Sequence, residues 1–156
     1  MQGHSICDPI AADVSLGGRE AVRTNFSLLI SSLMSTVVFL AEDEPLLREM
    51  MEVELRESHM IVHAMRNGAE LIKRLATQVP DIILLDLLMP IMDGYAVLQE
   101  LQTRKNTVPV VVLSNISDPA EEQKCRTLGA CDFLVKSHFD STELGTIVLR
   151  YVKGEE

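Results

Sequence analysis

The chain has few cysteines, and their spacing follows no pairing pattern. It contains three in 156 residues, and Cys7, Cys125 and Cys131 form no CxxC motif. An odd count without paired spacing argues against a disulfide framework and against a structural zinc site. We therefore expect reduced thiols, as in a cytoplasmic protein.

Basic residues are in the minority, with 14 Lys and Arg against 23 Asp and Glu and a formal net charge of −9. Proteins that bind nucleic acid directly need a basic surface, and so do proteins that dock on anionic membranes. We therefore expect neither nucleic acid nor a membrane among the partners.

Long apolar runs are also missing. No stretch approaches the roughly 18 apolar residues of a membrane-spanning helix, and the nearest one, residues 26–34, is interrupted by three serines. The N-terminus lacks the charged and apolar regions of a secretory signal. Neither a P-loop nor a GxGxxG motif occurs, so nucleotide binding has no support in the sequence.

The first 36 residues differ in pattern from the remainder. Glycine and proline punctuate their first half, and no regular periodicity is present there. From Arg19 onward, apolar residues at helical spacing allow an amphipathic helix that docks on the domain or on a partner. The alternative is a partly ordered extension without a role, or an overlong reading frame with Met34 as the start. We predict an N-terminal extension over residues 1–36, partly helical, and one domain over residues 37–156.

Short apolar segments alternate with amphipathic segments along that domain. We expect strands at residues 37–41, 60–65, 82–85, 110–113 and 131–135. Helices are expected at residues 45–55, 70–77, 95–104, 119–129 and 144–152. The apolar run at 82–85 is too short for a buried helix and suits a strand covered on both faces. Strands that alternate with helices predict a parallel α/β domain with right-handed crossovers.

Polar side chains follow four of these strands at the point where each strand ends. They are Glu42 and Asp43 after the first strand, Asp86 after the third, Ser114 after the fourth and Lys136 after the fifth. Taken singly, each is explained as a cap, a turn residue or a solvated side chain. Because the carboxyl ends of parallel strands share one edge of a sheet, we expect them to meet there.

The chemistry of such a cluster is specific. Two carboxylates about 4 Å apart repel by roughly 4 kcal/mol at an effective dielectric constant near 20, so the cluster either takes up protons or binds a cation. Hard oxygen ligands with room for water and a phosphate suit Mg²⁺ better than zinc. Lys136 would supply a positive charge and Ser114 a hydrogen-bond donor. The pattern predicts that Asp86 is a nucleophile that accepts a phosphoryl group.

The segments that carry these residues resemble the receiver domain of two-component response regulators, of the stand-alone chemotaxis-receiver type. The matching segments are residues 39–44, 81–94, 110–114 and 129–136, and the resemblance covers residue 37 to the C-terminus. The combination is highly specific, although no single segment is. It implies a flavodoxin-like three-layer sandwich: a five-stranded parallel sheet in the order 2-1-3-4-5 with helices on both faces, whose switch point lies between strands one and three.

The resemblance also implies roles for individual residues. Asp86 is similar to the family's phosphoacceptor, and Asp43 to its direct Mg²⁺ ligand. Glu42 matches a carboxylate that assists Mg²⁺ binding through water. Leu88 matches the position whose backbone carbonyl oxygen completes the metal's ligand shell.

Three further positions match the phosphate-binding and switching residues. Ser114 matches the switch hydroxyl, Lys136 the phosphate-contacting lysine, and Phe133 the aromatic rotamer switch. Two positions depart from the family pattern. Ser137 follows the lysine where proline is usual, and a cis bond before serine costs roughly 2.5–4 kcal/mol, so we expect a different loop path. Asn115 follows the switch serine where a smaller residue is common, which bears on the access of water to a phosphoaspartate.

The leading hypothesis is a phosphorelay signalling switch. A sensor histidine kinase or a histidine phosphotransfer protein would donate a phosphoryl group to Asp86 with Mg²⁺ bound. Ser114 and Phe133 would then rearrange the face formed by the fourth helix, the fifth strand and the fifth helix. We expect the output to be contact with an unidentified downstream protein, or a homodimer through that face, because no effector domain follows Glu156. Apart from its own phosphorylation and slow dephosphorylation, we expect no enzymatic activity.

Two alternatives belong to other functional classes. A degenerate receiver would act as a constitutive scaffold, but all the chemical residues are present. A metal-dependent phosphatase of the haloacid dehalogenase type would need a second aspartate two positions after the nucleophile, where Leu88 stands. The four histidines show no ligand spacing, and we predict no role for them.

Overall fold

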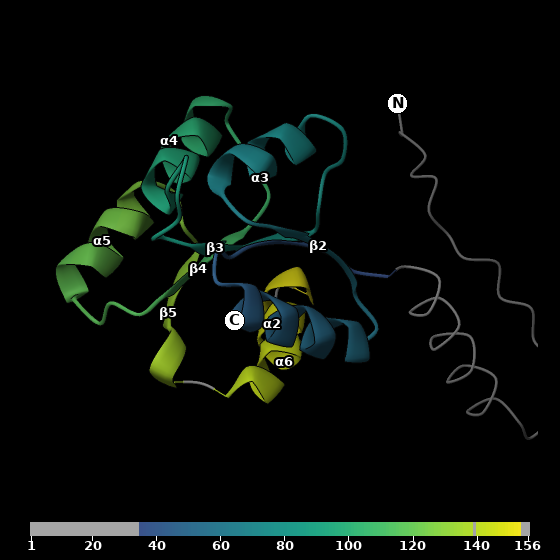
Figure 1. Ribbon diagram of the computed structural model, residues 1–156. Coiled ribbons are helices and arrows are strands. Elements are labelled where there is room, and N and C mark those ends of the chain that lie inside the picture. The colour runs from purple at the N-terminus through teal and green to yellow at the C-terminus, as the bar shows by residue number, and fades with distance from the viewer. Residues whose placement is uncertain (1–34, 139, 154–156) are drawn as a thin grey trace, which may run out of the picture. The chain divides into compact units, whose positions relative to one another are not determined.

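The apolar segments form one parallel sheet in the computed structural model, which describes residues 35–138 and 140–153 (Figure 1). Its strands are β1 (Val37–Ala41), β2 (Ile61–Met65), β3 (Ile82–Asp86), β4 (Val110–Ser114) and β5 (Asp132–Val135). Their order is β2-β1-β3-β4-β5, which confirms the order that the resemblance implied. The switch point therefore lies between β1 and β3. Asp43 comes two residues after the end of β1, and Asp86 is the last residue of β3. The amphipathic helix hypothesised from Arg19 onward lies outside the described residues.

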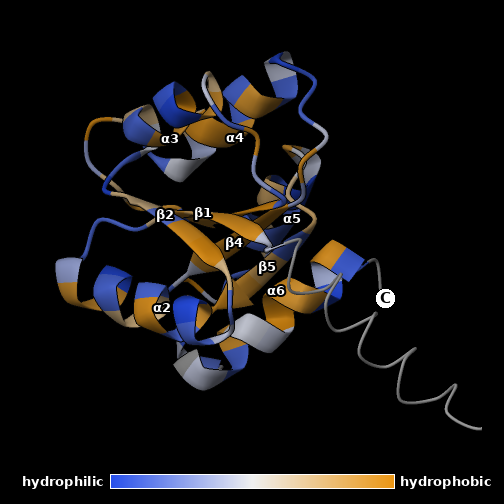
Figure 2. Cartoon of the chain, turned by 90° about the vertical axis from the view of Figure 1, so that its right-hand side faces the viewer, coloured by the Kyte–Doolittle hydropathy of each residue, from blue (hydrophilic) through white to orange (hydrophobic). Residues whose placement is uncertain are grey.

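Helices cover both faces of this sheet. They are α2 (Pro45–Glu57), α3 (Gly68–Leu75), α4 (Gly94–Thr103), α5 (Pro119–Thr127) and α6 (Leu144–Lys153), with 3₁₀ turns η1 (Lys136–His138) and η2 (Ser141–Glu143). Figures 1 and 2 show α2 and α6 on one face and α3 and α4 on the other. The predicted three-layer α/β architecture is confirmed.

Local capping explains where several helices begin. Pro119 occupies the first turn of α5, and the side chain of Asp118 accepts a hydrogen bond from the Ala120 N–H at 2.9 Å. Asn67 caps α3 by accepting from the Glu70 N–H, also at 2.9 Å. These side chains satisfy amide donors that the first turn of a helix leaves without backbone partners.

The core lies in two apolar layers, one on each side of the sheet. Phe39 packs on the α3–α4–α5 side, whereas Val38 and Leu40 pack on the α2–α6 side, as alternation along a strand requires. The central strands β3 and β4 are buried at every residue, including their polar last residues, Asp86 and Ser114. The strands are accordingly apolar along most of their length, whereas the helices alternate between apolar and polar residues (Figure 2).

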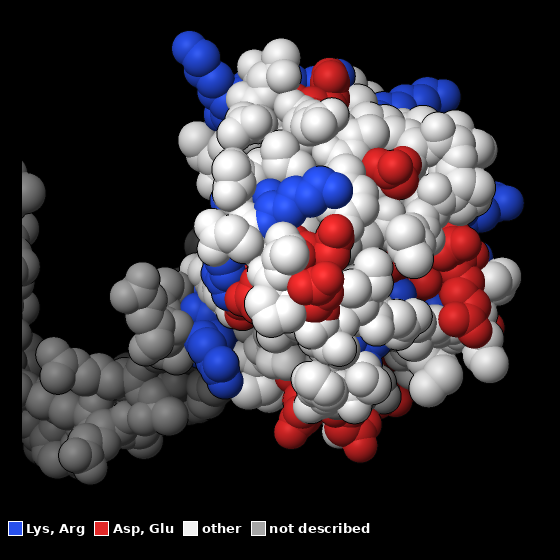
Figure 3. All heavy atoms as spheres, turned by 90° about the vertical axis from the view of Figure 1, so that its left-hand side faces the viewer, with Lys and Arg blue, Asp and Glu red and all other residues white. Residues whose placement is uncertain are grey.

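The distribution of charge can be followed on one face of the domain. Figure 3 shows the side on which α5 lies, where acidic and basic side chains are mixed and no broad basic surface forms. Within the described ranges, no helix is long and apolar enough to span a membrane. Cys125 and Cys131 are free thiols.

Candidate functional site

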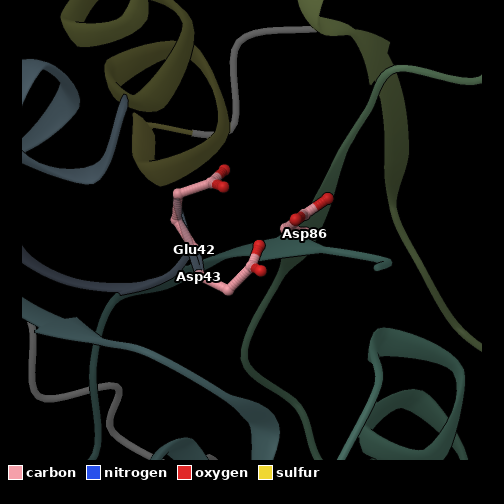
Figure 4. Close-up of side chains that lie close together, drawn as sticks. All are labelled: Glu42, Asp43 and Asp86. Carbon is pink, nitrogen blue, oxygen red and sulfur yellow. The ribbon is translucent and has the colours of Figure 1, made fainter. Parts of the chain in front are cut away.

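Three carboxylates meet at the carboxyl edge of the sheet. Glu42 and Asp43 directly follow β1, and Asp86 is the last residue of β3. One oxygen of each side chain lies within 4.8 Å of the other two, and Figure 4 shows the three side chains projecting into the same space. Glu42 and Asp86 are buried, whereas Asp43 is the most exposed of the three. The carboxylates predicted to converge do so.

Lys136 directly follows β5 and reaches this cluster along the same edge of the sheet. Its Nζ lies 2.6 Å from Glu42 Oε2 and 3.3 Å from Asp86 Oδ1, and its side chain is 8% exposed. The peptide bond to Ser137 is not cis, and the residues after β5 form the 3₁₀ turn η1. The lysine thus contacts the acidic residues without proline at the following position.

Burial dominates the electrostatics of the two inner carboxylates. It raises the pKa of Asp86, while the charge of Lys136 and the backbone N–H groups of Leu88 and Leu87 act in the opposite direction. Burial also raises the pKa of Glu42; the hydrogen bond from Lys136 lowers it, and the charge of Asp86 raises it. One ammonium against three carboxylates leaves a net charge of −2 when all are ionised. A site with this excess of negative charge and only oxygen donors is suited to a hard cation.

The loop after Asp86 is held by its backbone. Gly94 N–H donates to Leu87 O at 2.9 Å, and a Cβ at Gly94 would lie 2.5 Å from Asp86 O, so no side chain fits there. Ile91 has φ = 69°, an unusual value for a β-branched residue. The side chain of Leu88 is largely exposed, so this residue contributes little to the core. Strand β3 thus positions Asp86, and the backbone of the following loop packs closely against it.

Ser114 and Phe133 occupy the strands next to β3. Asp86 lies opposite Leu113 in the sheet, so Ser114 is one residue further toward the edge. Ser114 is buried, and its Oγ accepts a hydrogen bond from the Ile116 N–H at 3.0 Å. Phe133 lies opposite Val112 and packs in the core, three residues before Lys136. Ser114 thus lies at the carboxyl edge of the sheet, whereas Phe133 lies in the core of the domain.

One residue of the site has no signal in the sequence. Arg48, in α2, donates from Nη1 to the backbone oxygens of Glu42 and Asp43, at 2.9 and 3.1 Å. It thereby holds the turn that presents both carboxylates. An arginine in an amphipathic helix is ordinarily a solvated surface residue, so the pattern alone could not identify it.

Comparison with known proteins shows which family this chain resembles in sequence. The family described as the response regulator receiver domain matches residues 38–149. The chain is 32% identical over 116 residues to the DNA-binding transcriptional regulator NtrC of Escherichia coli, covering 74% of this chain and 24% of NtrC. It is 35% identical over 115 residues to the protein-glutamate methylesterase/protein-glutamine glutaminase of Treponema denticola, covering 70% of this chain and 31% of that protein. The chain therefore spans about a quarter to a third of the length of these two relatives.

Solved structures show the same fold. The receiver domain of the Francisella response regulator 1452 superposes with a TM-score of 0.73 at 24% identity, covering 78% of this chain and all of that one. The receiver domain of a signal transduction histidine kinase from Syntrophus aciditrophicus gives a TM-score of 0.69 at 32% identity, covering 78% and 93%. The family match spans well over half of the chain, and the strand order and the acidic edge agree with it. The chain belongs to the response regulator receiver domain family.

Proposed function

We propose that this receiver domain is a phosphorelay switch in which Asp86 accepts a phosphoryl group from a histidine kinase or a histidine phosphotransfer protein. The observation that carries the proposal is the placement of Asp86. It is a buried carboxylate at the end of a central strand, 3.3 Å from the Lys136 ammonium and grouped with two further carboxylates.

The transfer itself needs few groups. An oxygen of Asp86 attacks the phosphorus of a phosphohistidine, the P–O bond forms as the P–N bond breaks, and the imidazole leaves with its electron pair. The Lys136 ammonium lies close enough to Asp86 to turn from that carboxylate to the oxygens of the transferred group. Charge-assisted hydrogen bonds of this kind stabilise the charge on those oxygens.

The acidic cluster fits Mg²⁺, which would neutralise charge on the phosphoryl oxygens when bound. The hydrogen bonds of Glu42 indicate which carboxylates would bind the metal directly and which would act through water. Its Oε2 accepts from Lys136 at 2.6 Å, and its Oε1 from the Glu44 N–H at 3.3 Å. We therefore assign Asp43 and Asp86 as direct ligands, with the backbone oxygen of Leu88, and Glu42 as a residue that acts through water.

Ser114 and Phe133 would pass the modification to the surface. Ser114 can donate its hydroxyl hydrogen to a phosphoryl oxygen, since its hydrogen bond with the Ile116 N–H uses the oxygen as an acceptor. Beside Phe133, a cavity lined by Pro119, Glu122 and His138 opens between α5 and β5. We propose that Phe133 changes its rotamer there and alters the α5–β5–α6 face, which then binds a downstream protein or a second copy of the chain.

Incubation with acetyl phosphate and Mg²⁺ tests this function. We expect one acid-stable, alkali-labile phosphoryl group per chain, and none in the Asp86→Asn variant. A folded protein that takes up no phosphate would instead be a scaffold. Sustained hydrolysis of phosphate esters would indicate a phosphatase of the haloacid dehalogenase type.

A further inference from the structure

The outer edge of the sheet carries a pocket that the phosphoacceptor site does not use. Among the described strands, β2 pairs with β1 alone, so its other edge is open there. A cavity of about 570 Å³ lies along this edge, lined by Arg56 from α2, His63 and Ala64 from β2, and Lys73 and Arg74 from α3. Figure 2 looks onto this side, with α3 on one side of β2 and α2 on the other.

Arg74 lies in this pocket with neutral partners. Its Nη2 is 3.0 Å from His63 Nδ1 and donates to Gln78 Oε1 at 3.1 Å. Its Nε is buried and has no hydrogen-bond partner in the part of the chain that the structure describes. Buried polar groups normally have partners, and a guanidinium group normally pairs with an anion. Arg74 therefore has an unused donor and an unbalanced charge.

Two acidic residues, Glu52 and Glu70, also line the pocket, and each has a partner other than Arg74 and Lys73. Glu52 pairs with Arg56 at 2.6 Å, and Glu70 accepts a hydrogen bond from the Arg66 backbone N–H at 3.0 Å. Lys73 is exposed and forms no ion pair with a carboxylate among residues 35–138 and 140–153. Three basic side chains (Arg56, Lys73 and Arg74) and two acidic ones (Glu52 and Glu70) line the pocket, so its formal charge is positive, and neither Lys73 nor Arg74 has a carboxylate in ion-pair contact within the described residues.

The strand edge adds backbone donors. Ile61 N–H donates to Thr36 O, and Met65 O accepts from Glu42 N–H, so these residues turn their backbone groups toward β1. Successive residues of a strand point their backbone N–H and C=O groups to opposite sides. The N–H groups of Val62 and Ala64 therefore point to the open edge. Burial, and then the charges of Arg74 and Arg56, lower the pKa of His63, which favours its neutral form.

We propose that this pocket binds a small oxyanion, a carboxylate or phosphate group, through the guanidinium of Arg74 and the ammonium of Lys73. The planar fork of arginine matches two oxygens of either group. The ligand takes the place of the Gln78 amide oxygen beside Nη2, and the guanidinium then presents Nε and Nη2 together. The site is separate from Asp86, so it does not depend on the proposed phosphorylation.

An NMR titration of the full chain tests the proposal. Inorganic phosphate and succinate are added separately, and the ring resonances of His63 are followed after assignment with the His63→Gln variant. We expect a saturable shift with at least one of the two anions, and a higher His63 pKa at saturation, because the anion offsets the charges of Arg74 and Arg56. The anion that saturates identifies the preferred group.

Variants separate this site from general charge effects. Arg74→Gln should weaken the apparent affinity roughly tenfold or more, and Arg74→Lys should restore only part of it, since lysine lacks the fork. Lys73→Gln should also weaken binding. Because Lys73 is exposed, this variant should fold normally, so it tests the proposal even if the Arg74 variants misfold. Lys153→Gln, which removes the same charge from α6, should leave the affinity unchanged. Absence of a saturable shift at His63, or equal affinity in Arg74→Gln and Lys73→Gln and wild type, would overturn the proposal.

Discussion

Lys136 and Glu42 form the shortest ion pair of the acidic edge, with 2.6 Å between Nζ and Oε2, although 94 positions separate them in the chain. Both side chains are less than a tenth exposed. The pair fixes the ammonium group between β1 and β3, where it also faces Asp86. The lysine therefore both balances charge in the resting domain and stands ready to contact a transferred phosphoryl group.

Removal of this ammonium group should destabilise the domain. In Lys136→Met, two buried carboxylates lose the cation that both of them contact, and losing one partner of a buried pair typically costs about 3–5 kcal/mol. We expect a fall of about 3 kcal/mol in the free energy of unfolding without Mg²⁺, and partial recovery when Mg²⁺ is added. Urea denaturation measures both, with Lys153→Gln as the surface control. Equal stability of Lys136→Met and wild type would show that the pair contributes nothing.

Asp86→Asn should stabilise the domain against unfolding in the absence of Mg²⁺. Burial raises the pKa of Asp86 in the folded state, so its ionised form opposes folding at neutral pH. Each tenfold difference in proton affinity between the folded and unfolded chains corresponds to about 1.4 kcal/mol. The amide removes that cost, and the variant should melt at a higher temperature. The gain should shrink as the pH falls through the raised pKa, since wild-type Asp86 is then protonated as well.

Asp93→Asn is the matched control, because Asp93 lies in the same loop and asparagine caps a helix as well as aspartate does. Its melting temperature should change little. Added Mg²⁺ should stabilise wild type and Asp93→Asn more than Asp86→Asn. An unchanged or lower melting temperature for Asp86→Asn would contradict the predicted cost of its charge.

Gly94→Ala should disturb the acceptor loop through sterics. The added Cβ would lie 2.5 Å from Asp86 O and 2.8 Å from Leu87 Cα, so the backbone beside the acceptor must move. Overpacking of this kind costs roughly 1–3 kcal/mol, and we also expect slower phosphorylation by acetyl phosphate. Gly129→Ala is the comparison, since its Cβ meets open space at φ = 100° and adds only backbone strain. Phosphorylation that slows equally in both variants would exclude a local effect on Asp86.

His63 should make the stability depend on pH. Its folded-state pKa is lowered, so between that value and the ordinary one, near 6.5, the unfolded chain binds the proton more readily. Stability should fall as the pH is lowered through this window. His63→Gln should lose less stability over the same change, as measured by thermal melting. A wild type and variant that respond identically would show that His63 does not contribute.

The convergence of Glu42, Asp43, Asp86 and Lys136 could be predicted because parallel strands end at a common edge and each of these residues comes at a strand end. Ser114 ends β4 at the same edge. The strand order came from the resemblance to the receiver family. Helix and strand bounds were within a few residues. For example, α4 begins at Gly94, one residue before the predicted start, because Asp93 caps it.

Side-chain partners could not be predicted in the same way. Lys136 lies closer to Glu42 than to Asp86, and neither this preference nor the 3₁₀ turn that begins at Lys136 was predicted from the sequence. Arg48 and Arg74 act through contacts with backbone oxygens and a histidine ring, which depend on how helices pack against strands. Spacing along the chain specifies which face of a helix is apolar but not which neighbour a long side chain reaches.

Intact-mass analysis after incubation with acetyl phosphate and Mg²⁺ tests the central claim most directly. The account predicts that wild type and Asp93→Asn gain the mass of one phosphoryl group, that Asp43→Asn gains far less, and that Asp86→Asn gains none while remaining folded. Peptide mapping should place the group on Asp86. Equal phosphorylation of Asp86→Asn and wild type, or no phosphorylation of folded wild type, would contradict the assignment of Asp86 as the acceptor.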